Sequence, residues 1–371
     1  MTATPTYVLA AGGTGGHLFP AEAIARLLVE HGAAVHLLTD RRADAFAASV
    51  PGVAVDLVRA GQLGGGPLHA AYGLAELAMG MMQARRLLRR LAPAAVVGFG
   101  GYPSVPTMLA AAQLSLPTLI HEQNVVLGRA NRLLAPRARC IAAGFAAVQG
   151  LRQADRSRVV HTGNPVRSAI HAVGATPYAP PGETIELLIT GGSQGARIFS
   201  EVLPVALALL PAELRARLHV SQQARPEDKD AVTAQYQALG IASDIESFFT
   251  DMPVRLRRAH LVICRAGAST IAELAIAGRP AILVPYPHAM DDHQTANAGE
   301  FAKAGGGLMM PQSEFTPAAL AERLTALLAD PAALAAAAAA ARDFARDDAA
   351  EHLAGLVQSL ASNGKPMERA A

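Results

Sequence analysis

The stretch GGTGGH, Gly12–His17, is the part of the sequence that best predicts the fold. It follows an apolar run, residues 7–11, and precedes apolar residues spaced as on one face of a helix. A strand, a glycine turn and a helix are therefore predicted. Glycine allows a ligand to approach the backbone closely, and the free N–H groups of a helix's first turn favour negative charge. The turn is a candidate binding site for an anion or a sugar phosphate.

The same pattern returns in the second half of the chain. Residues 185–190 predict a strand, residues 191–195 a glycine turn, and Ile198, Val202, Val205 and Leu209 the buried face of a helix. A chain of 371 residues is longer than one hydrophobic core usually organises. We predict the α/β fold class with two Rossmann-like domains, residues 1–166 and 167–343, each built on a parallel sheet. A last helix, at about residues 344–361, is expected to pack back on the first domain.

Composition and motif spacing exclude several classes of protein. The longest uncharged segment, residues 91–120, holds four prolines and is not one membrane-spanning helix. No basic region precedes residues 7–11, so no signal peptide is predicted and a cytoplasmic location is expected. Leu18 stands where a dinucleotide fingerprint needs glycine. Two cysteines are too few for a disulfide scaffold. The D-x-D at residues 228–230 follows Pro-Glu and not a strand, so we interpret it as the start of a helix and predict no metal site.

Positive charge is concentrated in the first half. Residues 1–166 hold 15 arginines, no lysine and 8 acidic residues, although the whole chain has a net charge of only +2. Within this half, residues 68–91 combine apolar side chains with Arg85, Arg86, Arg89 and Arg90. Two interpretations stay open: an interfacial contact with an anionic membrane surface, or a core helix with a solvated arginine end.

Polar or glycine-rich segments follow three predicted strands of the first half. They are Gly12–His17, Gly98–Ser104 and His121–Asn124. The carboxyl ends of parallel strands form the ligand crevice of such a sheet, so these segments are expected to meet at one cleft. In the second half, Thr270-x-x-Glu273 fits a capping box, which is the structural alternative to a binding role for that glutamate.

Seven motifs in order resemble the MurG family of bacterial lipid I N-acetylglucosaminyltransferases. They are Gly12–His17, Gly98–Ser104, His121–Asn124, Gly163–Arg167, Gly191–Arg197, Cys264–Glu273 and Asp292–Gln294. The resemblance implies a GT-B fold, with the two parallel sheets facing across a cleft. It implies inverting, metal-independent transfer of N-acetylglucosamine from UDP-N-acetylglucosamine to the 4-hydroxyl of the muramoyl sugar in lipid I, without a cofactor. The product would be lipid II, for peptidoglycan synthesis. The enzyme would attach peripherally to the cytoplasmic face of the inner membrane, and no nucleic-acid partner is expected.

The resemblance also implies roles for individual residues. In the first domain it places Thr14, Gly15 and Gly16 beside the transferred sugar and Asn124 at the cleft. The second domain would bind the donor: Arg167 and Ser193 at the diphosphate, the backbone of Phe249 at the uracil, Ala268, Ser269 and Thr270 at the phosphates and sugar, Glu273 at the ribose hydroxyls, and Gln294 with Asn297 at the sugar hydroxyls.

The general base is predicted on the first domain. His17 ends the first glycine turn at the carboxyl end of a strand, and imidazole is the side chain best suited to accept a proton near neutral pH. Glu122 is the alternative base, because it also ends a strand at the cleft. The rival functions are a UDP-N-acetylglucosamine epimerase, a transferase with a soluble acceptor, and a nucleotide-sugar-binding regulator without turnover.

Overall fold

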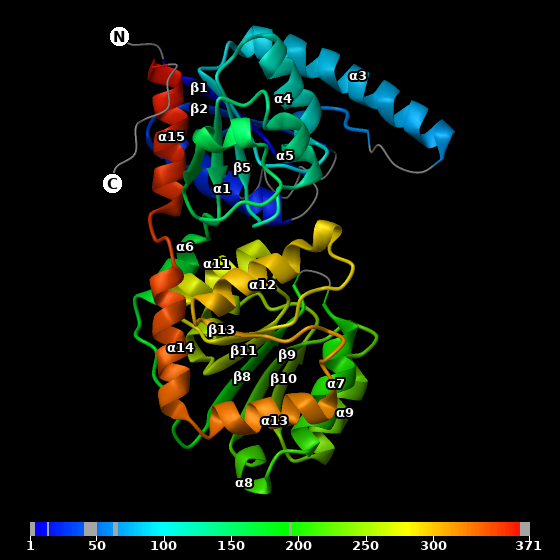
Figure 1. Cartoon of the computed structure of the whole chain (residues 1–371), viewed down its shortest axis with the longest axis vertical. Coiled ribbons are helices and arrows are strands. Elements are labelled where there is room, and N and C mark those ends of the chain that lie inside the picture. The colour runs from blue at the N-terminus through cyan, green and yellow to red at the C-terminus, as the bar shows by residue number, and fades with distance from the viewer. Residues whose placement is uncertain (1–3, 13–14, 41–49, 62–65, 193–194, 364–371) are drawn as a thin grey trace. The chain divides into compact units, whose positions relative to one another are not determined.

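The computed structural model describes residues 4–12, 15–40, 50–61, 66–192 and 195–363 (Figure 1). The chain divides into two compact units, residues 1–166 together with 348–371, and residues 167–347. Each unit is a parallel sheet with helices on its faces, and is considered by itself. The last helix, α15 (Ala349–Asn363), belongs to the first unit and packs against its first helix, α1 (Gly15–Glu30).

The first unit contains a seven-stranded parallel sheet in the order β3-β2-β1-β4-β5-β6-β7. The strands are β1 (Thr6–Ala10), β2 (Ala34–Thr39), β3 (Val53–Leu57), β4 (Ala95–Gly98), β5 (Thr118–Glu122), β6 (Cys140–Ala143) and β7 (Val159–His161). The helices besides α1 and α15 are α3 (Pro67–Leu91), α4 (Ser104–Gln113), α5 (Arg129–Leu134) and the 3-10 helix η1 (Gln153–Arg158).

The sheet of the first unit is buried on both faces, as a parallel sheet requires. In β1, Leu9 points to a core shared with Ile24 of α1 and Val357 of α15. The neighbouring Val8 points to the opposite core, which includes Leu88 of α3. Successive side chains of a strand face opposite sides, so the continuous apolar run of β1 supplies both cores.

The second unit contains a six-stranded parallel sheet in the order β10-β9-β8-β11-β12-β13. The strands are β8 (Ile185–Thr190), β9 (Leu218–Gln223), β10 (Ala242–Glu246), β11 (Leu261–Cys264), β12 (Ala281–Leu283) and β13 (Gly307–Met309). The helices are α6 (Ser168–Gly174), α7 (Arg197–Ala208), α8 (Ala212–Arg215), α9 (Lys229–Ala238), α10 (Met252–Arg258), α11 (Ala268–Ala277), η2 (Met290–Asp292, 3-10), α12 (His293–Lys303), α13 (Pro317–Leu328) and α14 (Pro331–Phe344).

Several local predictions need correction. The sequence at residues 245–249 predicts a strand there, but β10 lies at 242–246, so Phe249 follows the strand. The predicted buried face of α7 is half right: Val202 is buried and Ile198 packs against the core, but Val205 and Leu209 are 47% and 58% exposed. Phe199 and Leu203 are buried instead. The apolar residues of this helix form an arc wider than the stripe that is buried, so periodicity alone did not locate the core-facing part of that arc. The two cysteines are free and buried.

Both sheets reverse strand order at their first strand. From β1 the chain first builds outward through β2 and β3, and then returns to the other side of β1 with β4. The second unit does the same at β8, between β9 and β11. In open parallel sheets such a switch point leaves a crevice at the carboxyl ends of the strands, where ligands bind. The glycine turns that follow β1 and β8 lie at these two points.

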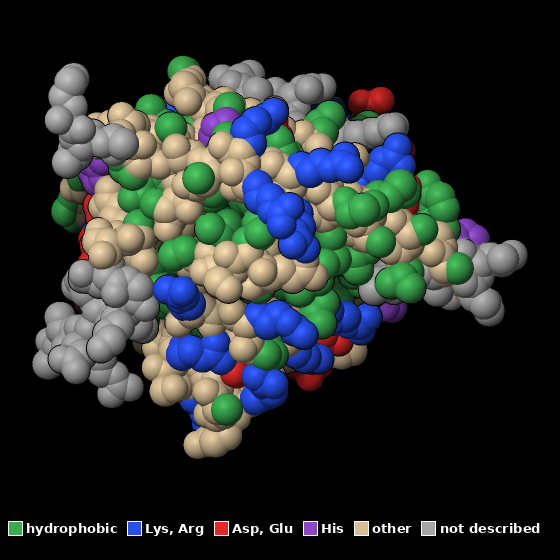
Figure 2. Space-filling model, turned by 90° about the horizontal axis from the view of Figure 1, so that it is seen from above, with side chains coloured by type: hydrophobic (Ala, Val, Ile, Leu, Met, Phe, Trp, Pro, Cys, Tyr) green, Lys and Arg blue, Asp and Glu red, His purple; other side chains and the backbone are tan. Residues whose placement is uncertain are grey.

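Helix α3 has one buried and one exposed side. Ala84 and Leu88 are buried, and Arg59 beneath the helix pairs with Glu76 at 3.1 Å. The opposite side exposes apolar and basic side chains together, namely Tyr72, Leu74, Met82, Arg85, Arg86, Arg89 and Arg90. The N-terminal part of α3 extends past the sheet in Figure 1, and Figure 2 shows lysine and arginine side chains lying among apolar ones on this face of the molecule.

The described residues contain no single helix with the length and apolar character to cross a membrane. Two consecutive helical segments, residues 317–328 and 331–362, are long and apolar enough only when they are taken together, and a bend of 93° separates them.

Candidate active site

The first glycine turn lies against the loop that follows β4. A Cβ at Gly12 would be 2.7 Å from the Cβ and Cγ of Pro103, so only glycine fits where the two loops cross. Helix α1 begins at Gly15, which puts Gly15, Gly16 and His17 in its first turn, where backbone N–H groups have no partner within the helix. Thr14 lies outside the described residues.

His17 is held between two other loops of the same unit. Its Nδ1 is 3.2 Å from Oε1 of Gln123, in the segment that follows β5. A Cβ at Gly100 would be 3.4 Å from the imidazole Cε1, and one at Gly101 would be 3.3 Å from Cδ2. Both glycines have positive φ, 85° and 73°. The three segments that were predicted to meet at the carboxyl ends of β1, β4 and β5 do lie together around His17.

Behind His17 is a buried polar network that consists of Gln123, His121 and the carbonyl groups of Phe99 and Gly163. Gln123 Nε2 donates to the Phe99 carbonyl at 2.9 Å and lies 3.1 Å from Nδ1 of His121. His121 Nε2 lies 3.2 Å from the Gly163 carbonyl oxygen. Burial lowers the pKa of His121 to about 4, with the nearby His17 acting in the same direction, so His121 is neutral near pH 7.

The carboxylate of Glu122, the alternative base, already accepts hydrogen bonds from the loop after β5 and from α5. One carboxylate oxygen accepts from the backbone N–H of Asn124 at 3.0 Å and from Asn124 Nδ2 at 3.3 Å. The other accepts from the backbone N–H of Gly128 and from Asn131 Nδ2, both at 2.9 Å. The glutamate is 2% exposed. It therefore ties the loop after β5 to α5, and Asn124 faces this carboxylate.

In the second unit, two predicted donor-binding residues contact each other. Arg167 Nη2 and Nε lie 2.8 and 3.1 Å from Oε1 of Glu273. The Glu273 side chain is only 16% exposed, and burial raises its pKa above the usual range, although Arg167 opposes this shift. Helix α11 begins at Ala268 with Gly267 as its N-cap, so Thr270 is not the cap and the capping-box interpretation of Glu273 is wrong.

The first turn of α11 follows β11, which is the neighbour of β8 at the switch point. Ala268, Ser269 and Thr270 are its first three residues, and the N-cap residue, Gly267, has no side chain that could cap their N–H groups. This helix start can accept negative charge from a ligand. Helix α7 begins at Arg197 behind the glycine turn after β8, and Ser193 of that turn lies outside the described residues.

Gln294 and Asn297 of α12 hold the loops around the start of α11. Gln294 Oε1 accepts from the backbone N–H of Tyr286 at 2.9 Å and of Ala266 at 3.2 Å. Asn297 is fully buried and donates to the Ala266 carbonyl at 3.3 Å. Within the described part of the chain no group accepts from Gln294 Nε2, which is therefore the atom of this pair that can meet a ligand.

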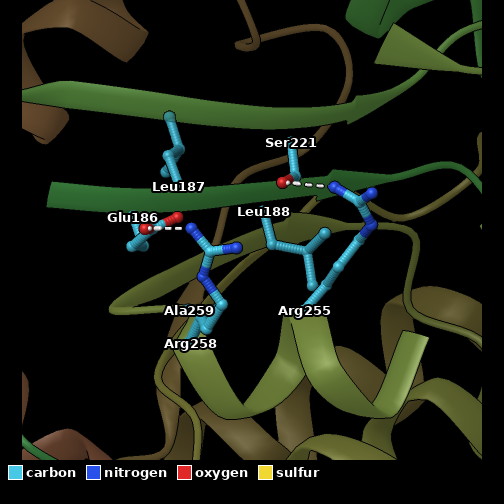
Figure 3. Close-up of a pocket in the computed structure, with 7 residues that line it drawn as sticks. All are labelled: Glu186, Leu187, Leu188, Ser221, Arg255, Arg258 and Ala259. Carbon is cyan, nitrogen blue, oxygen red and sulfur yellow. Dashed lines mark hydrogen bonds and ion pairs between the residues drawn. The ribbon is translucent and has the colours of Figure 1, made fainter. Parts of the chain in front are cut away.

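A small pocket between β8, β9 and α10 is lined in part by Arg255 (Figure 3). The Cζ atom of Arg255 also lies 4.1 Å from the centroid of the Phe249 ring. The charged groups of this pocket satisfy each other. Arg258 pairs with Glu186 at 2.7 Å, and Arg255 donates to Ser221 Oγ at 2.8 Å. Glu186 lies near the amino end of β8, away from the carboxyl edge where the glycine turn begins. We therefore assign this pocket a structural role.

Sequence reasoning did not single out His121, Gln123 or Gly163 as individual site residues. They lie in predicted motifs, but the residues predicted from the motif at 121–124 are their neighbours Glu122 and Asn124. The available signal was the polar run His121–Asn124 at the end of a fully buried strand, since buried polar side chains are normally hydrogen-bonded to one another or to backbone.

Two parallel-sheet units, each with a glycine turn and helix start at its switch point, define the class of GT-B glycosyltransferases. Residues 7–143 match the glycosyltransferase family 28 N-terminal domain, and residues 186–353 match the glycosyltransferase family 28 C-terminal domain. The chain belongs to glycosyltransferase family 28.

Relatives and solved structures agree with this assignment. The chain is 58% identical to the UDP-N-acetylglucosamine--N-acetylmuramyl-(pentapeptide) pyrophosphoryl-undecaprenol N-acetylglucosamine transferase of Rhodospirillum centenum, over 96% of this chain and 95% of that protein. It is 53% identical to the protein of the same name from Paramagnetospirillum magneticum, over 98% of each. The crystal structure of Acinetobacter baumannii MurG superimposes with a TM-score of 0.78 at 32% identity, covering 96% of this chain and 99% of that one.

Proposed function

We propose that this protein transfers N-acetylglucosamine from UDP-N-acetylglucosamine to the 4-hydroxyl of the muramoyl sugar of lipid I. The product is lipid II, a precursor of peptidoglycan. The observation that carries the proposal is the identity of 53 to 58% with transferases of that name, which extends over both units. Lipid I is the acceptor those names describe, a muramyl pentapeptide on undecaprenyl diphosphate.

The donor is assigned to the second unit. A departing UDP develops negative charge, which the N–H groups at the start of α11 and the guanidinium of Arg167 can stabilise. Glu273 sits beside Arg167 with a carboxylate oxygen that can accept hydrogen bonds from the ribose hydroxyls. Gln294 keeps an amide N–H group for the transferred sugar. Binding would therefore replace part of the Arg167–Glu273 contact with contacts to the donor.

The base is assigned to His17 in the first unit. The acceptor hydroxyl must lose its proton as it attacks the anomeric carbon from the face opposite UDP, and the transfer then inverts the configuration. His17 is part-buried at the switch point, whereas the carboxylate of Glu122 already accepts four hydrogen bonds. Proton uptake by Glu122 would break that set, so we give it a structural role.

Release of UDP tests the proposal directly. The full-length protein is mixed with UDP-N-acetylglucosamine, with and without a lipid I analogue in detergent. UDP release that depends on the analogue, together with a disaccharide product, is expected. Binding of UDP-N-acetylglucosamine without release in either mixture would identify a regulator. Release of UDP with formation of an epimerised sugar and no need for acceptor would identify an epimerase. The 17% identity to a Listeria monocytogenes protein described as a putative UDP-N-acetylglucosamine 2-epimerase supports a shared fold alone.

We further propose that the enzyme attaches peripherally to the cytoplasmic face of the inner membrane through α3. The exposed side of this helix carries apolar side chains beside Arg85, Arg86, Arg89 and Arg90. Apolar side chains can enter the interface while arginines contact anionic headgroups. The acceptor carries an undecaprenyl chain, so a membrane-bound surface next to the first unit would keep the enzyme close to its substrate.

Vesicle binding tests this surface. Replacement of the four arginines by Gln should weaken binding to vesicles that contain phosphatidylglycerol, by about 1 kcal/mol per charge. High salt should weaken wild-type binding in the same way. A matched control replaces Arg197, Arg215, Arg217 and Arg323 of the second unit by Gln and should bind almost as the wild type. Equal binding by both variants would instead make α3 a core helix with a solvated end.

A further inference from the structure

We infer that Gln123, positioned by the buried His121, fixes the tautomer of His17 so that its Nε2 is left unprotonated and faces the acceptor. The inference rests on the proposed function, because it gives His17 its form as the general base. Gln123 and His121 are positioning residues. The family resemblance implied no role for either residue. All of their contacts described here lie inside the first unit.

The orientation of the Gln123 amide is determined by its surroundings. A backbone carbonyl can only accept, so the group of Gln123 that lies 2.9 Å from the Phe99 oxygen is the NH2 group. The amide oxygen must then point the other way, to His17 Nδ1 at 3.2 Å. Gln123 is 2% exposed, so water does not offer alternative partners that would make the opposite orientation acceptable.

His121 adds a second constraint in the same direction. Its Nε2 faces the Gly163 carbonyl, which again can only accept, so the single proton of neutral His121 is on Nε2. Its Nδ1 therefore carries a lone pair and accepts from the second N–H of Gln123, at 3.1 Å. Complete burial keeps His121 neutral, which this arrangement requires. A flipped Gln123 amide would put oxygen against both the Phe99 carbonyl and the His121 lone pair.

The consequence for His17 follows from the amide oxygen. An oxygen acceptor at Nδ1 requires a proton there, and a neutral imidazole has only one N–H. Nε2 is then a lone-pair acceptor, and the described residues give it no hydrogen-bond partner. When Nε2 takes the acceptor proton, the Nδ1 hydrogen bond to Gln123 is retained, so proton uptake needs no rearrangement. In a catalytic triad, presenting a histidine in the wrong tautomer lowers kcat by about 10⁴-fold.

The test reads the tautomer directly by nitrogen-15 NMR of the ring nitrogens in the full-length protein, without ligand. The chain has 12 histidines, and the signals of His17 are those lost in His17→Ala. In the wild type, with His17 neutral, we expect a protonated Nδ1 and an unprotonated Nε2. A proton on Nε2 in the wild type overturns the proposal, and this measurement does not depend on any variant of Gln123 folding.

Gln123→Met tests the cause. Methionine has nearly the same length and apolar contacts but offers no amide oxygen, so both tautomers of His17 become accessible. Gln222→Met is the matched control, because Gln222 is also a buried glutamine but lies in the second unit. The control should leave the His17 signals unchanged. A His17 tautomer that is the same in Gln123→Met as in the wild type overturns the proposal.

Kinetics then separate positioning from folding. Gln123→Met should lower kcat at least about tenfold while the Kd for UDP-N-acetylglucosamine stays near the wild-type value. Retention of kcat despite a changed tautomer overturns the proposal. The NMR result does not depend on turnover. If the wild-type enzyme fails to release UDP with a lipid I analogue, the proposed function is contradicted, and the tautomer of His17 is still decided by the NMR measurement alone.

Discussion

The two switch points of the molecule have the same topology and different chemistry. Each lies beside a central strand, β1 or β8, where the strand order reverses. A glycine turn and a helix follow that central strand. At the first, the groups are two imidazoles, a buried amide and backbone carbonyls. At the second, they are a guanidinium, a carboxylate and the uncapped start of α11.

This difference shows that the topology determines where a binding crevice forms, and that the side chains determine its chemistry. Uncharged donors and acceptors in a fixed order suit the handling of one proton. Charged groups and helix N-termini suit a diphosphate. In this enzyme of glycosyltransferase family 28 we therefore expect damage at the first switch point to lower kcat, and damage at the second to weaken donor binding.

The largest effect is expected for His17→Ala. Loss of a general base should lower kcat by at least about a hundredfold, because such a group typically contributes 10²- to 10⁴-fold. The Kd for UDP-N-acetylglucosamine should stay near normal, since the proposed donor contacts lie in the second unit. Steady-state kinetics with a lipid I analogue and a separate donor titration give the two numbers.

The control for this prediction is His36→Ala. His36 is a histidine of the same unit that pairs with Asp56 on neighbouring strands, away from the switch point. It should keep nearly full kcat. If His17→Ala also keeps most of its kcat, the search for the base moves to Glu122. In that case Glu122→Gln, which otherwise should mainly destabilise the loop after β5, would abolish turnover.

Sequence reasoning predicted the fold class and the glycine turns, because these have strong local causes. Apolar runs such as β8 cannot be exposed, and the GGTGGH turn leaves few alternatives to a strand–turn–helix unit. It missed β6 and β13, which are short, and β3, which is partly exposed along its length. It also placed the buried face of α7 off centre, because the apolar residues form a broad arc and only tertiary packing selects the part that is buried.

For the candidate site, the sequence predicted which segments form the site but not which of their side chains are hydrogen-bonded to each other. The motif at residues 121–124 was found, but the separation of Gln123 from His17 is 106 residues along the chain, and no local rule connects them. Glu122 could be predicted as a carboxylate near the cleft. That four donors surround it depends on the path of the loop to Gly128 and Asn131, which only the folded chain reveals.

The next largest effect is expected on acidification and belongs to the first switch point. The pKa of His121 is about 4 in the folded protein and near 6.5 when the chain unfolds. Between these values the unfolded state binds more protons, so the free energy of unfolding decreases as pH falls from about 6.5 to 4, by about 3 kcal/mol in total from this group. Above pH 6.5 the group contributes no pH dependence.

Urea unfolding at several pH values, followed with wild type and His121→Gln, isolates this contribution. The difference between the two proteins should change with pH in the stated range, because carboxylates that titrate elsewhere affect both equally. An NMR titration should show His121 unprotonated at pH 5. If His121 instead titrates near pH 6.5, the buried network would accept a charged imidazole, and the contrast between a neutral and a charged switch point would be lost.

A slightly smaller effect is expected for Glu273→Ala at the second switch point. Loss of a charge-assisted contact should weaken binding of UDP-N-acetylglucosamine by about 2 to 3 kcal/mol, with a much smaller change in kcat. Burial raises the pKa of Glu273, so wild-type affinity should fall on acidification through that raised pKa, as the carboxylate is protonated. Calorimetric titration as a function of pH measures both effects.

Glu300→Ala is the matched control in the same unit. Glu300 pairs with Lys303 on the surface of α12, so its loss should leave donor affinity unchanged. Donor affinity that survives Glu273→Ala would mean that the Arg167–Glu273 pair holds the unit together without contacting the ribose. In that case urea unfolding, and not binding, would report the substitution.

The smallest effect is expected from removal of divalent metal, which should leave the transfer rate unchanged. The reason is the charge that the second unit itself supplies: Arg167 and the first turn of α11 can stabilise the departing diphosphate. The D-x-D at residues 228–230 spans the start of α9, as predicted, and its Lys229 pairs with Glu246 at 2.7 Å. Transfer is measured with excess EDTA and again after magnesium or manganese is restored, with detergent-solubilised acceptor so that the metal does not act through the membrane. Complete loss with EDTA and recovery with metal would show that these groups alone are not sufficient, and that the second switch point needs an ion to complete its charge.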